Sequence, residues 1–434
     1  MISSFDIGGE SRLLVDQAAA AEVAAVGFWY GIGSRDEAQD EAGSTHFIEH
    51  MLFKGTRSRD AFSIAREIDR LGGSINAFTE RECMAVHAVV PAEGFETALT
   101  ILADLVTDSR FDAEEFERER VVIENEIVAA DDDPEEAASD AFAERLWPGH
   151  ALARKIGGEV RDVRALGREG VYRRYLDNFR GLPPLITAAG GVEGDRVRDA
   201  VEAAFAGAEG HRGPPRRLPP PLPKSSGEPF RRSPHQQVQT FCAFQAAGPI
   251  PSSEYYALEV ANAAIGESMG SRLFQELRER RGLCYSVFSA PSLMEDASLF
   301  GVYATASKET AARLVDALSE ELVRIARTGL EAGEIADAKA HIRGGMKIAA
   351  ADAEYRMRRL ARQALYGAPN FSTAEADAGV AKVDAAAANE AMRRFFVHAP
   401  IFYGVGARTA ERSFTRSAQR ALDQMTALGM KVVD

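Results

Sequence analysis

Two histidines and a glutamate stand at helical spacing in residues 44–55, which read Ser44-Thr45-His46-Phe47-Ile48-Glu49-His50-Met51-Leu52-Phe53-Lys54-Gly55. An α-helix turns once in about 3.6 residues, so His46 and His50 lie on one face and can bind the same metal ion. Glu49 projects close to that face and can reach a metal-bound water without being a ligand itself. This order is the inverse of the commoner H-E-x-x-H zinc motif. We therefore predict a helix that carries a metal site.

The alternative interpretation is a surface helix with two solvated histidines. The neighbouring side chains disfavour it, because most of them are large and apolar and indicate a buried helix: Phe47, Ile48, Met51, Leu52 and Phe53. Buried histidines need polar partners, and a metal ion is one such partner.

The composition is that of a large globular protein. The chain has 434 residues, enough for two or more domains, and 46% of them are hydrophobic. The formal net charge of -14 disfavours binding to nucleic acid or to an anionic membrane. No run of about twenty apolar residues is present, so we expect no membrane-spanning helix.

The cysteines give no sign of a disulfide framework. Cys83, Cys242 and Cys284 are odd in number, far apart and without a C-x-x-C pair. Residues 1–6 lack the basic segment and apolar run of a secretory signal. We therefore expect a reducing compartment and a cytoplasmic location.

A proline-rich segment divides the chain nearly in half. Residues 213–223 read Gly-Pro-Pro-Arg-Arg-Leu-Pro-Pro-Pro-Leu-Pro, which predicts an extended spacer. We predict a catalytic metal-binding domain over 1–210, a linker over 211–234 and a second domain over 235–434. Strands expected near 22–30, 74–79 and 82–90 and helices near 61–71 and 113–130 favour an α+β fold.

The two halves resemble each other in apolar pattern. Residues 44–55 match residues 255–266, each a helix followed by glycine. In this register Ala257, Val260 and Ala261 stand where the first half has His46, Glu49 and His50. We therefore expect two similar domains, each a mainly antiparallel sheet covered by helices, with metal chemistry in the first domain alone.

A catalytic zinc site usually takes three protein ligands and leaves one position open, so a third ligand is required. The helix expected over 113–130 offers Glu119, Glu124 and Glu126. Glu119 and Glu126 are seven residues apart and share a face, whereas Glu124 points elsewhere and is expected to be solvated. From the residues alone, ordinary surface glutamates paired with neighbouring arginines are the favoured interpretation.

The whole motif resembles that of the pitrilysin/insulinase family of zinc peptidases, the inverzincins. The similarity is greatest to the branch that contains mitochondrial processing peptidase and its bacterial relatives. His46-x-x-Glu49-His50 matches the metal motif of the family, and residues 43–56 are close to the family's own sequence. The 75 residues between His50 and Glu126 match that branch's spacing to its third ligand.

This resemblance implies a ligand set and a mechanism. His46, His50 and Glu126 would bind one zinc ion per chain, and Glu119 would be the catalytic-site acid that supports a ligand. Glu49 would act as general base on a metal-activated water. Paired halves of the family's fold enclose a clam-shell chamber, of which one chain would form half.

The second half carries a further family feature in residues 278–285, Arg-Glu-Arg-Arg-Gly-Leu-Cys-Tyr. From the residues alone, Arg278 is expected to be a solvated helix residue. Tyr285 is expected to be a strand residue that is equally able to lie in the core or at the surface. The resemblance implies that Tyr285 stabilises the oxyanion and that Arg278 helps to hold the peptide.

Residues 73–79 resemble the family's substrate-binding edge strand, with Asn76, Ala77 and Phe78 as the substrate-binding residues. An edge strand binds an extended peptide through backbone hydrogen bonds. On pattern alone, an ordinary strand is the favoured interpretation.

The sequence therefore predicts a zinc-dependent endopeptidase that cleaves peptides or unfolded segments in an enclosed chamber. One alternative is a noncatalytic partner or scaffold subunit on the same fold, and another is a zinc hydrolase of small molecules. One chain carries both the metal motif and the Arg278/Tyr285 pair, so no second gene product is needed. In the longer single-chain relatives that this sequence resembles, the metal lies in the first of four similar domains and the arginine–tyrosine pair in the last. The resemblance therefore implies a homodimer in which that pair acts in trans.

Overall fold

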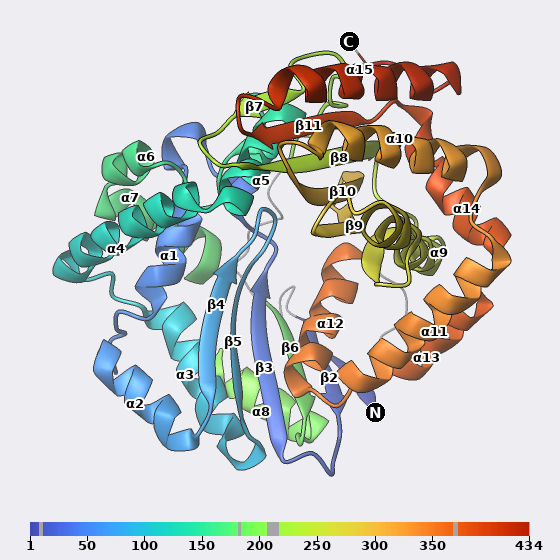
Figure 1. The fold of residues 1–434 in the computed structure, drawn as a ribbon. Coiled ribbons are helices and arrows are strands. Elements are labelled where there is room, and N and C mark those ends of the chain that lie inside the picture. The colour runs from blue at the N-terminus through green and yellow to red at the C-terminus, as the bar shows by residue number, and fades with distance from the viewer. Residues whose placement is uncertain (8–11, 181–183, 206–216, 368–371, 434) are drawn as a thin grey trace. The chain divides into compact units, whose positions relative to one another are not determined.

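The computed structural model describes residues 1–7, 12–180, 184–205, 217–367 and 372–433. Residues 211–216 of the predicted linker lie outside this set. The chain forms two compact units, each with its own sheet (Figure 1). Unit 1 comprises 1–132, 154–218 and 348–365, and unit 2 comprises 133–153, 219–347 and 366–434.

Unit 1 is built on a six-stranded sheet in the order β1-β2-β6-β3-β5-β4. All neighbouring strands are antiparallel except β2 and β6. The strands are β1 (Ile2–Asp6), β2 (Arg12–Gln17), β3 (Val23–Tyr30), β4 (Ser74–Thr79), β5 (Met84–Pro91) and β6 (Leu185–Gly190). β4 is an edge strand, so one side of its backbone pairs with no other strand of this sheet.

One face of this sheet packs against the main core of unit 1. Side chains alternate between the two faces along a strand, as β5 shows: Val86, Ala88 and Val90 face that core, whereas Ala85 and His87 face the other side. The helices of this unit that precede residue 210 are α1 (Ser44–Leu52), α2 (Ala61–Leu71), α3 (Phe95–Asp108), α4 (Ala113–Asp132), α6 (Val160–Ala165), α7 (Arg168–Tyr175) and α8 (Gly194–Ala204).

The other face of the unit 1 sheet is covered by a helix from late in the chain, α12 (Ala353–Tyr366). Met357 of α12 packs with Trp29 of β3 in a small buried cluster. Arg356 donates two hydrogen bonds to the carboxylate of Asp16, at 2.6 and 2.9 Å, which fixes α12 to β2.

Unit 2 is built on a five-stranded sheet in the order β7-β11-β8-β10-β9. Its strands are β7 (Phe230–Arg232), β8 (Gln237–Ala247), β9 (Ser286–Leu293), β10 (Ala297–Ser307) and β11 (Ile401–Gly406). Only β7 and β11 pair in parallel. Its helices are α5 (Pro134–Leu146), α9 (Tyr255–Asn262), α10 (Ala311–Thr328), α11 (Ala332–Ala349), α13 (Thr373–Lys382), α14 (Ala385–Arg393) and α15 (Glu411–Ala427).

The first half of the chain contributes α5 to unit 2. Phe142 of α5 stacks on Phe241 of β8, with ring centroids 4.6 Å apart, and Trp147 donates a 2.9 Å hydrogen bond to Gln245. The two halves therefore exchange one helix each, α5 for α12 (Figure 1). The predicted division at 1–210, 211–234 and 235–434 follows chain order and does not contain this exchange. One crossing between the units, Leu218 to Pro219, lies within the predicted linker.

The α+β fold with two mainly antiparallel sheets agrees with the prediction. In unit 2 the positions matched to the metal motif are apolar and buried: Ala257 is 7% exposed, and Val260 and Ala261 are fully buried. These residues pack in the unit 2 core rather than around a polar site. Among the described residues, no helix is long and apolar enough to cross a membrane.

Candidate metal centre

Helix α1 is held in place at its start and on its buried side. Gly43 precedes it with φ 85°, and a Cβ there would lie 2.5 Å from the backbone oxygen of Gly157, so this position requires glycine. The buried Glu37 carboxylate accepts from the backbone N–H groups of Gly43 at 2.9 Å and Thr45 at 2.7 Å. This carboxylate therefore caps a helix that has no side-chain cap of its own.

The ring of Phe47 stacks on Phe116 of α4, with centroids 4.2 Å apart. This contact on the buried side of α1 joins it to the helix that supplies the third predicted ligand. The polar side of α1 carries His46, Glu49 and His50, all partly buried.

Three side chains converge on one point: His46, His50 and Glu126. Their candidate ligand atoms all lie within 4.8 Å of one another. The Nε2 atoms of His46 and His50 are 3.2 Å apart. One carboxylate oxygen of Glu126 lies 3.8 Å from His46 Nε2 and 3.3 Å from His50 Nε2.

These separations fit a tetrahedral zinc ion. Ligand bonds of about 2.0–2.1 Å at tetrahedral angles put ligand atoms about 3.3–3.4 Å apart. The two histidine nitrogens and the Glu126 oxygen come close to this spacing, so little adjustment is needed. Two imidazoles and one carboxylate are also a ligand set of catalytic zinc sites.

His50 has a carboxylate behind it. Its Nδ1 lies 3.0 Å from an oxygen of Glu119, whose side chain is 7% exposed. The other oxygen of Glu119 lies 2.5 Å from Lys54 Nζ. A proton on Nδ1 shared with Glu119 leaves Nε2 free to bind a metal.

The pKa values of the metal-free site reflect this arrangement. Burial, with the charge of His50, lowers the pKa of His46 to about 4. Burial opposes protonation of His50 too, but hydrogen bonds with Glu119 and Glu126 raise its pKa to about 9. Burial alone would raise the pKa of Glu119, but hydrogen bonds from His50 and Lys54 hold that pKa below its usual value. His50 thus carries the proton that a metal ion would displace.

Glu49 stands beside the three converging side chains but is not one of them. Its Oε2 accepts a 2.6 Å hydrogen bond from the hydroxyl of Thr79, at the end of β4. Burial raises the pKa of Glu49 in spite of this bond. A carboxylate next to a metal site, with one oxygen uncommitted by this bond, can accept a proton from water.

The predicted substrate strand is β4. Asn76 is exposed, and Phe78 is half-buried against Trp29, with ring centroids 5.7 Å apart. Ala77 is 7% exposed and packs in the core, so it can contact a bound peptide only through its backbone.

Arg278 and Tyr285 belong to unit 2 and lie close together there. Tyr285 is 79% exposed, so this residue does not pack in the core. The Arg278 guanidinium carbon lies 5.6 Å from the centroid of the Tyr285 ring and 4.6 Å from that of Phe274. The pair is therefore a preformed cation–π contact at the surface of unit 2.

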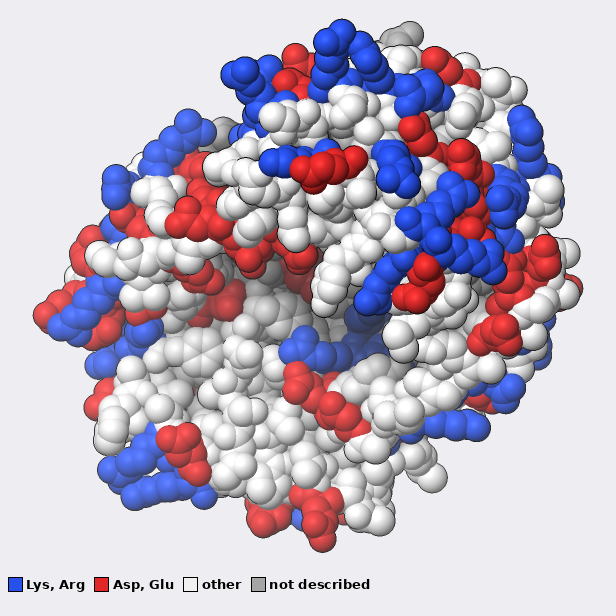
Figure 2. Space-filling model, in the orientation of Figure 1, with Lys and Arg blue, Asp and Glu red and all other residues white. Residues whose placement is uncertain are grey.

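The exposed side of α4 carries interspersed acidic and basic side chains (Figure 2). Glu124 was expected to be solvated, but its side chain is only 18% exposed and pairs with Arg164 at 2.7 Å. Its partner comes from α6, which packs beside α4 and could not be inferred from the helix alone.

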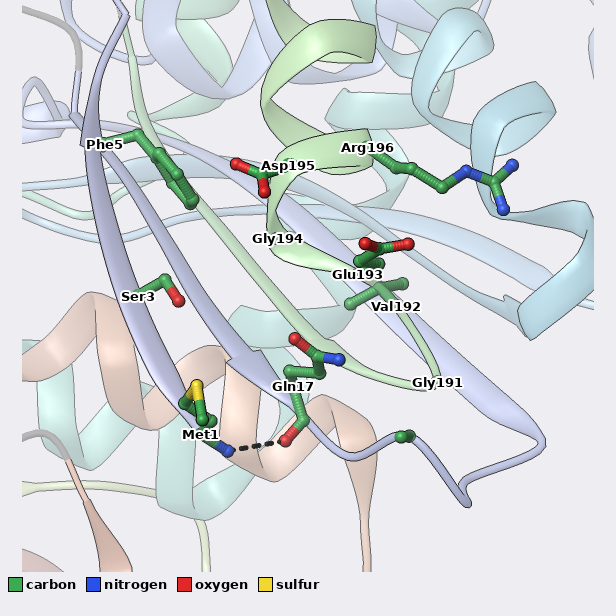
Figure 3. A pocket seen from close by; sticks show the side chains of 11 residues that line it. Met1, Ser3, Phe5, Gln17, Gly191, Val192, Glu193, Gly194, Asp195 and Arg196 are labelled. Atoms are coloured by element: carbon green, nitrogen blue, oxygen red, sulfur yellow. Dashed lines mark hydrogen bonds between the residues drawn. The ribbon is translucent and has the colours of Figure 1, made fainter.

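A pocket of about 620 Å³ lies elsewhere in unit 1, between β1 and the segment that leads into α8 (Figure 3). Phe5 and Asp195 line it, and the Met1 amine donates a 2.8 Å hydrogen bond to the backbone oxygen of Gln17. None of the predicted site residues lines it, so it does not belong to the metal centre.

Sequence reasoning assigned no role of their own to Glu37, Lys54 or Thr79, although Thr79 ends the segment likened to a substrate-binding strand. Lys54 stands one helical turn after His50, a spacing that pointed to the same face. Glu37 and Thr79 come from a loop and a strand, and only packing brings them to α1.

Comparison with known proteins identifies the family. The profile of Insulinase (Peptidase family M16) matches residues 12–159, and that of the peptidase M16 inactive domain matches residues 171–342. The chain belongs to peptidase family M16.

Relatives of this M16 chain match it over most of their own length. An uncharacterised zinc protease of Mycobacterium leprae is 35% identical over 83% of this chain and 81% of its own length. One of Mycobacterium tuberculosis is 36% identical over 83% of both chains. Another, from Bacillus subtilis, is 29% identical over 83% of this chain and 87% of its own.

Solved structures show the same fold. The peptidase M16 inactive domain from Pseudomonas fluorescens has a TM-score of 0.83 at 18% identity, over 94% of this chain and 98% of its own. A protease from Helicobacter pylori has a TM-score of 0.83 at 16% identity, over 94% and 99%. A chain of complex III2 from Candida albicans has a TM-score of 0.80 at 18% identity, over 98% and 100%.

Proposed function

We propose that this M16 chain is a zinc-dependent endopeptidase of peptides or unfolded polypeptide segments, with one zinc ion per chain. The observation that carries the proposal is the convergence of His46, His50 and Glu126, with Glu49 beside them as a carboxylate outside the ligand set. The description of relatives as zinc proteases supports it.

The zinc ion would be held by His46, His50 and Glu126 and would supply Lewis acidity, polarising the scissile carbonyl and making water more acidic. Glu49 accepts the proton of the attacking water and delivers it to the leaving amine. Glu119 and Lys54 keep the His50 ring in the orientation and tautomer that binding requires.

The substrate would bind as an extended strand along β4. The edge of β4 that pairs with no strand of the described sheet offers backbone hydrogen bonds, and the exposed Asn76 and the half-buried Phe78 lie beside it. Such binding selects extended chain rather than a strict sequence, which suits peptides and unfolded segments.

Tyr285 would stabilise the oxyanion, and Arg278 would help to hold the peptide. Their mutual contact and the exposure of Tyr285 support this role. We propose further that two chains form a homodimer around an enclosed chamber, so that this pair serves the metal centre of the other chain. A cytoplasmic location suits the three free cysteines.

The alternative is a noncatalytic partner or scaffold subunit on the same fold, a fold that a chain of complex III2 from Candida albicans shares. Against it stands the presence of His46, Glu49, His50, Glu119 and Glu126 together, since a scaffold needs none of them.

The test combines zinc analysis with peptide cleavage. The purified chain is expected to contain about one zinc per chain and to cleave a mixed peptide library, read by mass spectrometry. A chelator should abolish cleavage and added zinc should restore it. The Glu49→Gln protein, purified identically, controls for contaminating peptidases. Stoichiometric zinc with no cleavage beyond that control would favour the noncatalytic alternative.

A further inference from the structure

The hydroxyl of Thr79 makes a short hydrogen bond to the proposed general base. Thr79 Oγ1 lies 2.6 Å from Glu49 Oε2, within the range of a hydroxyl that donates to an ionised carboxylate. The two residues are on different elements, since Glu49 lies on α1 and Thr79 is the last residue of β4. The contact therefore exists only because the helix packs against the strand end.

Among the described residues, the bond from Thr79 restricts a carboxylate that is otherwise held by charge alone. A glutamate side chain has three rotatable bonds, and the charge of His50 favours the ionised form of Glu49 whereas that of Glu126 opposes it. Threonine is suited to hold it, because its branched Cβ restricts χ1 and its strand pairs with Met84 of β5 in the sheet. With Oε2 bound to Thr79, Oε1 is the oxygen available to water.

We propose that Thr79 is a positioning residue for peptide hydrolysis, fixing the Glu49 carboxylate in register with a peptide bound along β4. The inference rests on the proposed function, because it assigns Thr79 a role through the general base. Thr79 belongs to the same short strand as Asn76 to Phe78. The residue that holds the Glu49 carboxylate is therefore part of the strand that would bind the peptide. The hydroxyl donates to Glu49 throughout and is neither consumed nor ionised.

The first experiment compares Thr79→Val, which keeps the shape but removes the donor, with Thr79→Ser, which restores it. Thr79→Val should lower kcat about ten- to hundredfold, the usual effect of losing a hydrogen bond to a charged group or of misplacing a catalytic group. KM and zinc affinity should stay within about twofold, because neither the ligands nor the strand edge is altered. Thr79→Ser should recover most of the rate.

Two controls separate positioning from folding. Thr107→Val removes a hydroxyl that bonds within α3 and should leave kcat unchanged. In a Glu49→Gln background, adding Thr79→Val should cause no further loss, because a residue that acts through Glu49 has nothing left to position. If Thr79→Val does not fold, Thr79→Ala takes its place.

A second measurement does not depend on activity. Unfolding of the metal-free protein with Thr79→Val, Glu49→Ala and both substitutions should show less than additive destabilisation, because each removes the same contact. Additive effects, an unchanged kcat in Thr79→Val, or an equal loss in the Glu49→Gln background would each overturn the inference. If wild-type protein cleaves no peptide, the proposed function fails while the unfolding cycle still tests the contact.

Discussion

The Nδ1 atom of His50 lies 3.0 Å from the carboxylate of Glu119, one of the few buried glutamates of unit 1. This contact decides which nitrogen of His50 is free, because a proton held between Nδ1 and Glu119 leaves Nε2 facing His46 and Glu126. The relationship leads directly to a prediction about metal affinity.

Glu119→Ala should weaken zinc binding about ten- to hundredfold without abolishing it, the usual cost of losing a group that orients a ligand. Competition with a chromogenic chelator measures the change. Glu124→Ala is a matched control on the same helix, because Glu124 pairs with Arg164 and not with the histidines. Equal zinc affinity in wild type and Glu119→Ala would mean that Glu119 does not support metal binding.

His50→Ala should remove both zinc and activity, because two remaining ligands make an incomplete site. Elemental analysis of the dialysed protein measures the metal. His341→Ala, at an exposed position of α11, should retain about one zinc per chain. Tight stoichiometric zinc in His50→Ala would contradict the ligand assignment.

Glu49→Gln should keep the metal and lower turnover about a hundred- to ten-thousandfold, the usual contribution of a general base. Zinc content and kcat are measured on the same preparation. Loss of zinc would make Glu49 a ligand, and near-normal turnover would remove it from the mechanism.

Zinc binding should strengthen as the pH rises. In the metal-free site the pKa of His50 is about 9 and that of His46 about 4, so between these values His50 alone must lose its proton. Affinity should therefore rise about tenfold per pH unit from about pH 5 to 8 and level off above the pKa of His50. Calorimetry in buffers of different ionisation enthalpy should find about one proton released per zinc. A pH-independent affinity over this range would contradict the assignment.

A mixture of two inactive variants tests the proposed homodimer. If sites are shared between chains, Glu49→Gln protein mixed with Tyr285→Phe protein should regain about a quarter of wild-type activity after subunit exchange. About half of the dimers are then mixed, and each has one intact site of two. If subunit exchange is verified and activity does not recover, the trans arrangement is wrong, whereas the assignment of the zinc ligands is unaffected.

The local part of the metal centre could be read from the sequence. His46, Glu49 and His50 lie within one helix, where about 3.6 residues per turn fixes which side chains share a face. The same reasoning placed strands and helices of the first half, such as β4 at Ser74–Thr79 and α2 at Ala61–Leu71, because period and glycine stops are local signals. The third ligand came from a family resemblance rather than from the residues, since a glutamate on α4 looks like any other surface glutamate.

Only the tertiary structure determines the contacts between elements that are far apart in the chain. The stack of Phe47 on Phe116 sets α1 against α4 and so brings Glu126 to the histidines. Likewise, the exchange of α5 and α12 between the units and the bond from Thr79 to Glu49 join segments that no local period connects. The physical reason is that hydrophobic burial is non-directional: the pattern of a helix states that one face is buried, but not which surface buries it.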